Sequence, residues 1–142
     1  MERYNVYDCS IIELDKHHSD RKGNISVVEN GVTVPFDVKR VYYLYDVPGG
    51  ESRGGHAFRK NEEMIIALSG AFEVVVDDGE QQKRFYLNRS YYGLYIPKGL
   101  WRTMENFSTN AFALEFGSEH YDKSDYVHDY EQFKKLKSDE EI

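Results

Sequence analysis

The segment Arg53-Gly54-Gly55-His56-Ala57-Phe58-Arg59-Lys60 decides the fold that the sequence predicts. Glycine-rich backbone leads into a single imidazole, and two cations follow it. A short apolar run, Met64 to Leu68, comes next and ends at the turn pair Ser69-Gly70. Because a flexible loop here meets a buried strand, the chain can hold the His56 ring rigidly toward the interior of a β-barrel. His56 is therefore the first candidate for a functional side chain.

The sequence before and after this segment predicts short strands separated by turn residues. Asn30-Gly31 and Asp77-Asp78-Gly79-Glu80 contain dipeptides that favour hairpins, and Pro48-Gly49-Gly50 interrupts a run rich in Val and Tyr. The predicted strands are Tyr4–Leu14, Asn24–Glu29, Val38–Val47, Met64–Leu68, Ala71–Val76, Gln82–Leu87, Tyr92–Ile96, Trp101–Phe107 and Ala111–Phe116. Roughly nine short strands at this spacing predict an all-β fold, with Phe72, Val74 and Val76 on one face.

The C-terminal tail changes to a helical period. An apolar stripe recurs every three residues, at Val127, Tyr130, Phe133 and Leu136. Ser124 is the predicted N-cap of this helix. We expect one short helix that lies against the outside of the barrel.

Residues 15–23 are polar and predict a loop. This loop contains the pair His17-His18, which could suggest a metal site. Adjacent residues of an extended chain point to opposite sides, and no partner ligand lies nearby in the sequence. We interpret both histidines as solvated loop residues.

The composition narrows the class of protein. The chain has 142 residues, the length of one domain, and we expect residues 1–142 to form a single one. A net charge of -7 argues against a nucleic-acid surface, which needs a clustered basic field. Cys9 is the only cysteine, which excludes an intramolecular disulfide. Without an apolar run of membrane-spanning length or a signal-peptide core, we expect a cytoplasmic protein with no membrane partner.

Two stretches resemble the signature motifs of the cupins. In the first, Gly50, His56, Glu63 and Gly70 stand at the motif spacing, and the second is Gly93-Leu94-Tyr95-Ile96-Pro97-Lys98-Gly99-Leu100-Trp101. The resemblance implies an all-β, cupin-type β-barrel (jelly roll) with one short C-terminal helix.

Metal-binding cupins carry two further histidines in these motifs. Here the two positions hold Phe58 and Arg102, so two of the four ligands are missing. Because a tight divalent site usually needs three or more protein ligands, we expect a metal-free interior with His56 available for proton transfer.

A wider resemblance joins segments from Ile12 to Lys134. These segments are Val38-Lys39-Arg40-Val41-Tyr42-Tyr43, Arg53-Gly54-Gly55-His56-Ala57, Gly93-Leu94-Tyr95-Ile96, Trp101, Met104 and Tyr121-Asp122 with Asp125-Tyr126. In this order and spacing they resemble the dTDP-4-keto-6-deoxyglucose 3,4-ketoisomerases, the WxcM-like sugar isomerases. The resemblance implies a metal-independent homodimeric cupin. It also implies action on a dTDP-linked keto sugar, on the route to 3-amino-3,6-dideoxy sugars of surface glycans.

The implied reaction needs proton transfer and no redox cofactor. In a 4-keto sugar the C3 hydrogen is α to a carbonyl. A base removes it, an enediol-type intermediate forms, and a proton returns at C4. An imidazole can do both steps near neutral pH, so His56 is the predicted base and Tyr42 the second catalytic candidate. The family usually has a second imidazole where this chain has Phe58, which can neither take nor give a proton.

Cations and aromatic residues supply the substrate-binding candidates. Arg40 and Arg53 are predicted to hold the diphosphate, because guanidinium groups match pairs of phosphate oxygens. Tyr95 and Trp101 can line the interior or stack on thymine, with plain core packing as an equal alternative. The remaining substrate-binding candidates are Lys60, Glu63 and Arg102. For Lys60 the alternative is a solvated surface cation.

Two other functions stay open at this point. Phe58 supports a non-catalytic cupin that only binds a nucleotide sugar. A cupin 3,5-epimerase would abstract an α proton from the same class of substrate, although the motifs of that family are not those seen here. Phe58 and Arg102 together disfavour a metal-dependent oxygenase.

Overall fold

The structure is a computed structural model that describes residues 1 and 3–139. The strands are β1 (Ser10–Glu13), β2 (Lys16–Ser19), β3 (Gly23–Ser26), β4 (Arg40–Leu44), β5 (Arg53–Phe58), β6 (Glu63–Ser69), β7 (Phe72–Asp77), β8 (Gln82–Leu87), β9 (Tyr92–Ile96), β10 (Trp101–Glu105), β11 (Phe112–Gly117) and β12 (Tyr126–Val127). The helices are two short 3-10 turns, η1 (Val6–Asp8) and η2 (Lys123–Asp125), and α1 (Tyr130–Asp139). The prediction of a mostly β chain with one short C-terminal helix is confirmed.

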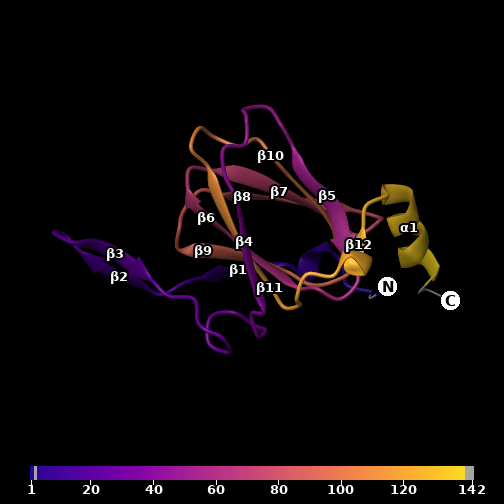
Figure 1. The fold of residues 1–142 in the computed structure, drawn as a ribbon, viewed down its shortest axis with the longest axis horizontal. Coiled ribbons are helices and arrows are strands. Elements are labelled where there is room, and N and C mark those ends of the chain that lie inside the picture. The colour runs from indigo at the N-terminus through magenta and orange to yellow at the C-terminus, as the bar shows by residue number, and fades with distance from the viewer. Residues whose placement is uncertain (2, 140–142) are drawn as a thin grey trace.

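The strands form two five-stranded antiparallel sheets and a separate two-stranded arm (Figure 1). The first sheet has the order β1-β9-β6-β11-β4, and the second has the order β12-β5-β10-β7-β8. The sequence led us to expect a closed barrel. Among the described residues, backbone pairing instead stays within each sheet, and the two sheets share a core.

Apolar side chains from both sheets fill the space between them. Ile65 and Leu94 come from the first sheet, and Phe72, Val74 and Val76 come from the second. All five are fully buried, and the predicted alternation of β7 is confirmed. Each such side chain contributes about 1.5–3 kcal/mol relative to exposure, so this core is a rigid frame for the polar groups beside it.

Helix α1 lies against the outside of the second sheet, as expected (Figure 1). Its Phe133 is fully buried and packs with Ala57 of β5 and Val127 of β12. Trp101 joins this cluster from β10, with its ring centroid 5.8 Å from that of Phe133. No helix in the described part of the chain is long and apolar enough to cross a membrane.

The start of α1 differs from the prediction. Ser124 lies in the turn η2, and the helix begins only at Tyr130. Asp129 takes the capping role, because its Oδ1 accepts hydrogen bonds from the backbone N–H groups of Glu131 at 2.8 Å and Gln132 at 3.2 Å. The intervening Tyr126–Val127 pairs with β5 as β12, and this pairing outweighs the helical spacing of the apolar stripe.

The predicted loop over residues 15–23 is also different. Residues 16–19 form β2 and pair with β3, and this arm projects away from both sheets (Figure 1). The arm carries polar residues on both faces, so its sequence lacks the alternation that predicts a strand. Backbone pairing holds β2 and β3 together. His17 and His18 are exposed, as expected, and His18 contacts Asn24 and Asp20, each at 2.6 Å.

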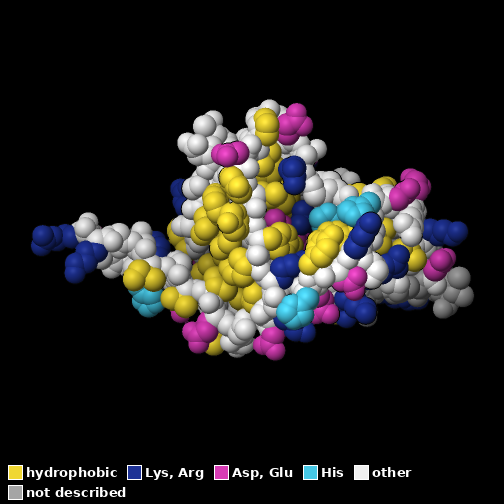
Figure 2. Space-filling view, in the orientation of Figure 1, with side chains coloured by type: hydrophobic (Ala, Val, Ile, Leu, Met, Phe, Trp, Pro, Cys, Tyr) yellow, Lys and Arg dark blue, Asp and Glu magenta, His cyan; other side chains and the backbone are white. Residues whose placement is uncertain are grey.

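Strand β4 is an edge strand with an exposed apolar outer face. Val41, Tyr43 and Tyr45 are 54%, 55% and 60% exposed, and the Tyr43 ring stacks on Phe112 of β11 at 5.2 Å. Hydrophobic side chains gather on this side of the molecule (Figure 2). We call the group Val41, Tyr43, Tyr45 and Phe112 the β4 face.

Candidate active site

His56 faces the space between the two sheets. On β5 it lies directly opposite Arg102 of β10, and side chains opposite each other in an antiparallel pair share a face. The neighbouring pair, Ala57 and Trp101, takes the other face and packs under α1. Arg102 is only 3% exposed, so the imidazole sits beside a buried cation.

A β-bulge brings Arg53 to the same face as His56. These residues are three positions apart on β5, but their partners Met104 and Arg102 are only two apart on β10. The extra residue is accommodated at Gly54, whose φ is +78°, a conformation that other residues rarely adopt. A Cβ at Gly54 would also lie 2.1 Å from Nη1 of Arg102. Glycine is therefore required here, which explains the sequence ahead of His56.

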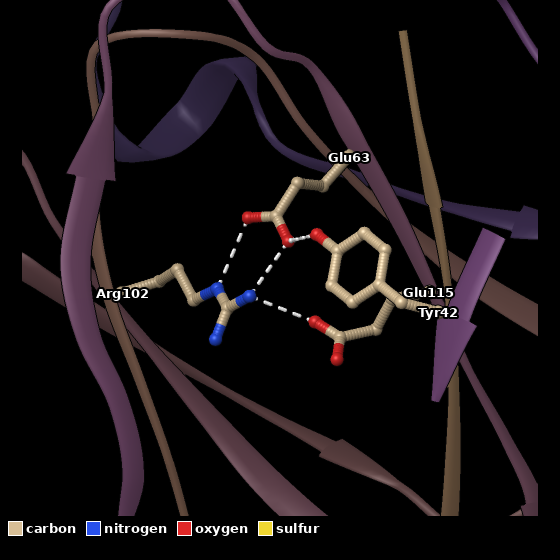
Figure 3. Close-up of polar contacts among 4 residues, drawn as sticks. All are labelled: Tyr42, Glu63, Arg102 and Glu115. Atoms are coloured by element: carbon tan, nitrogen blue, oxygen red, sulfur yellow. Dashed lines mark hydrogen bonds and ion pairs between the residues drawn. The ribbon is translucent and has the colours of Figure 1, made fainter. Parts of the chain in front are cut away.

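Arg102 bridges two buried carboxylates (Figure 3). Its Nε donates to Glu63 Oε1 at 3.0 Å, and its Nη2 donates to Glu63 Oε2 at 2.7 Å. The same Nη2 donates to Glu115 Oε1 at 2.7 Å. The hydroxyl of Tyr42 donates to Glu63 Oε2 at 2.8 Å, which completes a four-residue network.

One guanidinium cannot neutralise two carboxylates equally. For Glu63, burial opposes ionisation, but the charge and the two hydrogen bonds of Arg102 prevail and lower its pKa. For Glu115, burial is the largest effect, and together with the nearby Glu63 it raises the pKa to about 8. The two carboxylates therefore titrate as a pair, and Glu115 is the one whose protonated form is favoured. Burial first, then Glu63 and Glu115, raise the pKa of Tyr42, so its hydroxyl stays protonated.

Three rings surround the His56 imidazole. The ring of Phe58 lies edge-on at 4.7 Å, the ring of Tyr126 at 5.1 Å and the ring of His128 at 6.1 Å. Burial, followed by the charge of Arg102, lowers the pKa of His56 to about 3. The imidazole is therefore neutral near pH 7. Its Nε2 is buried and has no hydrogen-bond partner among the described residues.

Arg40 lies next to this group. Its Cζ stands over the rings of Tyr42 at 4.9 Å, Phe58 at 5.7 Å and Tyr121 at 5.8 Å. Its Nε is buried and contacts no described acceptor. A buried, unpaired guanidinium nitrogen is unfavourable by itself and is suited to an anion.

The chain matches one protein family over nearly its whole length. The model of the family described as WxcM-like, C-terminal (FdtA) matches residues 7–138. The chain belongs to this family.

Three proteins similar to this chain carry the name of a 3,4-ketoisomerase or 3,4-oxoisomerase. The chain is 36% identical over 116 residues to the TDP-4-oxo-6-deoxy-alpha-D-glucose-3,4-oxoisomerase of Aneurinibacillus thermoaerophilus, covering 82% of this chain and 84% of the relative. It is 37% identical to a 3,4-ketoisomerase from Helicobacter canadensis, with a TM-score of 0.89 over 92% of this chain and 98% of that one. A variant of the QdtA 3,4-ketoisomerase from Thermoanaerobacterium thermosaccharolyticum, solved with TDP-4-keto-6-deoxyglucose, is 29% identical. It has a TM-score of 0.91 over 94% of this chain and 96% of that one.

The structure brings together five of the residues predicted for the site of this WxcM-like chain. They are His56, Tyr42, Glu63, Arg102 and Arg40, and each has a contact or a charge interaction with at least one other of the five. Arg53 lies at the exposed end of the same face. No three His, Cys, Asp or Glu side chains of the described residues are grouped so that they could hold a metal ion.

Three predicted residues lie elsewhere. Trp101 packs against Tyr130 of α1 at 5.3 Å, on the outer face of the second sheet. Tyr95 packs in an apolar cluster with Met64, and its hydroxyl donates to Glu62 at 2.5 Å. The side chain of Lys60 is exposed. For these residues the structure matches the packing and surface alternatives rather than an interior position.

Sequence reasoning missed three residues near the site. Glu115 has a signal, since a carboxylate inside the otherwise apolar strand Ala111–Phe116 is rarely buried without a partner. Tyr126 belongs to a segment that carries the family resemblance but was given no role, and His128 has no signal in the sequence. Their position depends on the pairing of β12 with β5, a contact between segments almost seventy residues apart.

Proposed function

We propose that this protein is a sugar-nucleotide isomerase that interconverts dTDP-4-keto-6-deoxy-D-glucose and the dTDP-3-keto-6-deoxyhexose. Membership of the WxcM-like family and the likeness to 3,4-ketoisomerases over most of the chain support this activity. The observation that carries the proposal is the interior His56 imidazole, whose buried Nε2 has no partner among the described residues. Such a nitrogen is suited to exchange a proton with a bound sugar. The product belongs on the route to 3-amino-3,6-dideoxy sugars.

His56 is the base in this reaction. Its neutral nitrogen takes the proton from C3, the C3–H electrons form the C3–C4 double bond, and the carbonyl oxygen on C4 takes up a proton. In the second half the C3 hydroxyl loses its proton and becomes the ketone, and His56 returns a proton to C4. Burial and Arg102 hold the pKa of His56 near 3 in the free protein. The negative charge of a bound diphosphate favours the imidazolium, so substrate raises that pKa toward the working range.

Tyr42 handles the hydroxyl proton. Its own hydroxyl remains protonated and lies 2.8 Å from the Glu63 carboxylate, with the bound proton of Glu115 in the same network. On substrate binding the Tyr42 hydroxyl turns from Glu63 toward the sugar oxygen that gains charge, and it recovers a proton through Glu63. The contact with Glu63 supports this role, because the carboxylate that accepts from Tyr42 is placed to return a proton to it.

Arg40 and Arg53 bind the diphosphate. Arg40 is held over three rings with its Nε buried and unpaired among the described residues. Arg53 lines a pocket of about 320 Å³ between the ends of β4 and β5, together with Tyr45 and Pro48. Arg40 stands over Phe58, which follows His56 on β5, whereas Arg53 precedes it, so the two guanidinium groups flank the imidazole and each suits a phosphate group.

Following the sugar in deuterated water tests the function. We expect NMR spectra of dTDP-4-keto-6-deoxyglucose incubated with the protein to show a 3-keto species. Deuterium at C5 without that species would favour the 3,5-epimerase, which also abstracts an α proton. An unchanged sugar that still binds would favour the non-catalytic binding protein that Phe58 first suggested.

The protein acts as a homodimer. The apolar β4 face lies on an edge strand, and such a face is commonly covered by a second subunit. The β2–β3 arm projects from the body of the molecule and offers a second contact (Figure 1). A two-fold arrangement would place the same face and the same arm on both sides of the interface.

The fold is a cupin jelly roll in one domain, residues 1–142. The strand orders support it, because β4-β11-β6-β9 and β5-β10-β7-β8 alternate between the sheets in the order that two interlocked Greek keys produce. The family match over residues 7–138 supports a single domain.

A further inference from the structure

His128 lies where the His56 imidazole can reach solvent. It directly follows β12, whose Val127 pairs with Ala57, the neighbour of His56 on β5. Its ring meets the His56 ring edge-on, with the centroids 6.1 Å apart. At this separation one water molecule can bridge the two imidazoles and carry a proton between them. His128 is itself exposed, whereas the Nε2 of His56 is buried.

The orientation of His128 is fixed by stacking. Its ring lies nearly parallel to that of Tyr126, at 11° and 5.4 Å, and Tyr126 in turn contacts His56 at 5.1 Å. This stack holds His128 beside the active imidazole rather than free in solvent. An exposed histidine with only a surface role has no need of such a position.

The other neighbours of His56 are less suited to relay its proton. Burial raises the pKa of the Tyr126 hydroxyl, so this group stays protonated. Phe58 covers one side of the ring and has no exchangeable proton. Arg102 stays charged, because its buried guanidinium donates hydrogen bonds to the carboxylates of Glu63 and Glu115. Arg40 is likewise a permanent cation. His128 is therefore the neighbouring ring whose nitrogens can both accept and donate a proton.

We infer that His128 is a proton relay that exchanges the proton of His56 with solvent during the isomerisation; this inference rests on the proposed function. After His56 has taken the C3 proton, it passes that same proton through a bridging water molecule to His128, and His128 releases a proton to water. The reverse steps load His56 with a solvent proton, which it delivers to C4. Each step moves one proton and its charge, so no other reactant is needed. His128 thereby sets how much hydrogen at C4 comes from solvent and how much comes from C3.

The isotope content of the product tests the relay. The wild type and His128→Gln are each run in deuterated water to low conversion, and deuterium at C4 of the product is measured by NMR. Gln retains hydrogen bonding but cannot titrate. We expect mostly deuterium in the wild type and a deuterium-to-hydrogen ratio about tenfold lower in the variant, because acid–base assistance by a positioned imidazole is worth at least that much. The control is His120→Gln, another exposed histidine, which should leave the ratio unchanged.

A second variant separates a relay from a structural role. His128→Ala opens space beside Tyr126, and millimolar imidazole in the buffer should restore deuterium incorporation if the lost function is proton exchange. An unchanged ratio in His128→Gln, or little deuterium in the wild-type product, would overturn the relay while leaving the isomerase intact. So would a folded His128→Gln protein that forms no product, because a relay of this kind affects exchange and is not required for turnover. A wild type that forms no 3-keto product would instead overturn the proposed function.

Discussion

Arg102 and His56 lie directly opposite each other on β10 and β5, so a buried cation and the proposed base share one interior face. The bulge at Gly54 makes room for the guanidinium, and Glu63 and Glu115 anchor it. This arrangement fixes the position of the cation without hydrogen-bonding the imidazole. It explains why His56 is kept neutral although it lies beside a carboxylate network.

The first prediction concerns pH. In the folded protein the pKa of His56 is about 3, whereas the ordinary value is 6.5, so only the unfolded chain gains this proton as the pH falls between those values. His56 should thus lower the free energy of unfolding in mild acid. We expect the wild type to lose about 2 kcal/mol more than His56→Asn between pH 7 and about pH 5, measured by urea unfolding.

The comparison with His56→Asn is needed because a second group, Glu115, also makes the stability depend on pH. The raised pKa of Glu115 acts with the opposite sign, because its folded form binds a proton that the unfolded chain has already lost above its ordinary value of 4.5. That contribution is present in both proteins and cancels in the difference. Equal pH dependence in the two proteins would contradict the neutral His56.

The second prediction concerns the diphosphate. Arg40→Ala and Arg53→Ala should each weaken dTDP binding by about 1.5–3 kcal/mol, as expected for charge-assisted hydrogen bonds, in isothermal titration calorimetry. Arg89→Ala is the matched control, because Arg89 is exposed and its guanidinium donates to the neighbouring carbonyl of Asn88. Wild-type affinity in both Arg40→Ala and Arg53→Ala would refute the assignment.

The third prediction concerns assembly. Light scattering at micromolar concentration should give twice the chain mass of 16.6 kDa. The double variant Tyr43→Glu with Tyr45→Glu should give the monomer mass, since two charges on the β4 face oppose its burial. Tyr86→Glu should leave the mass unchanged, because Tyr86 is 60% exposed on the other sheet. A monomeric wild type would contradict the dimer.

The fourth prediction concerns the cap of α1. Asp129→Ala should lower the free energy of unfolding by about 1 kcal/mol, because two backbone N–H groups of the first turn lose their acceptor. Ser124→Ala should change it by less than half as much, as its hydroxyl bonds only to the exposed Asp122. Urea unfolding of both variants checks this, and the reverse ranking would return the cap to Ser124.

These cases show what the sequence could predict about the fold. Alternation marked the buried face of β7, and turn dipeptides marked the strand ends, because both effects are local. The arm and the start of α1 were predicted wrongly. Residues 16–19 are polar on both faces, and residues 126–127 form a strand only because β5 lies beside them.

The site shows the same limit. His56, Glu63 and Arg102 could be found from motif spacing, since the motifs place His56 and Arg102 on the paired strands β5 and β10 and Glu63 on β6 of the facing sheet. Tyr95 and Trp101 belong to those motifs too, yet they point to the outer faces. A register change of one residue reverses the face of a side chain, and the bulge at Gly54 could not be placed from the sequence alone.

The last prediction concerns the base itself. His56→Asn keeps a similar size and some hydrogen bonding, but Asn cannot accept a proton at neutral pH. Loss of a general base typically lowers turnover by about 10²–10⁴-fold, or about 3–5 kcal/mol of barrier. Turnover of dTDP-4-keto-6-deoxyglucose followed by NMR should fall by that range, while circular dichroism and dTDP affinity stay near wild type. If the folded variant keeps its turnover, the proton carrier is another interior group, and Tyr42 is the next candidate because it shares the network with Glu63 while Tyr95 faces away.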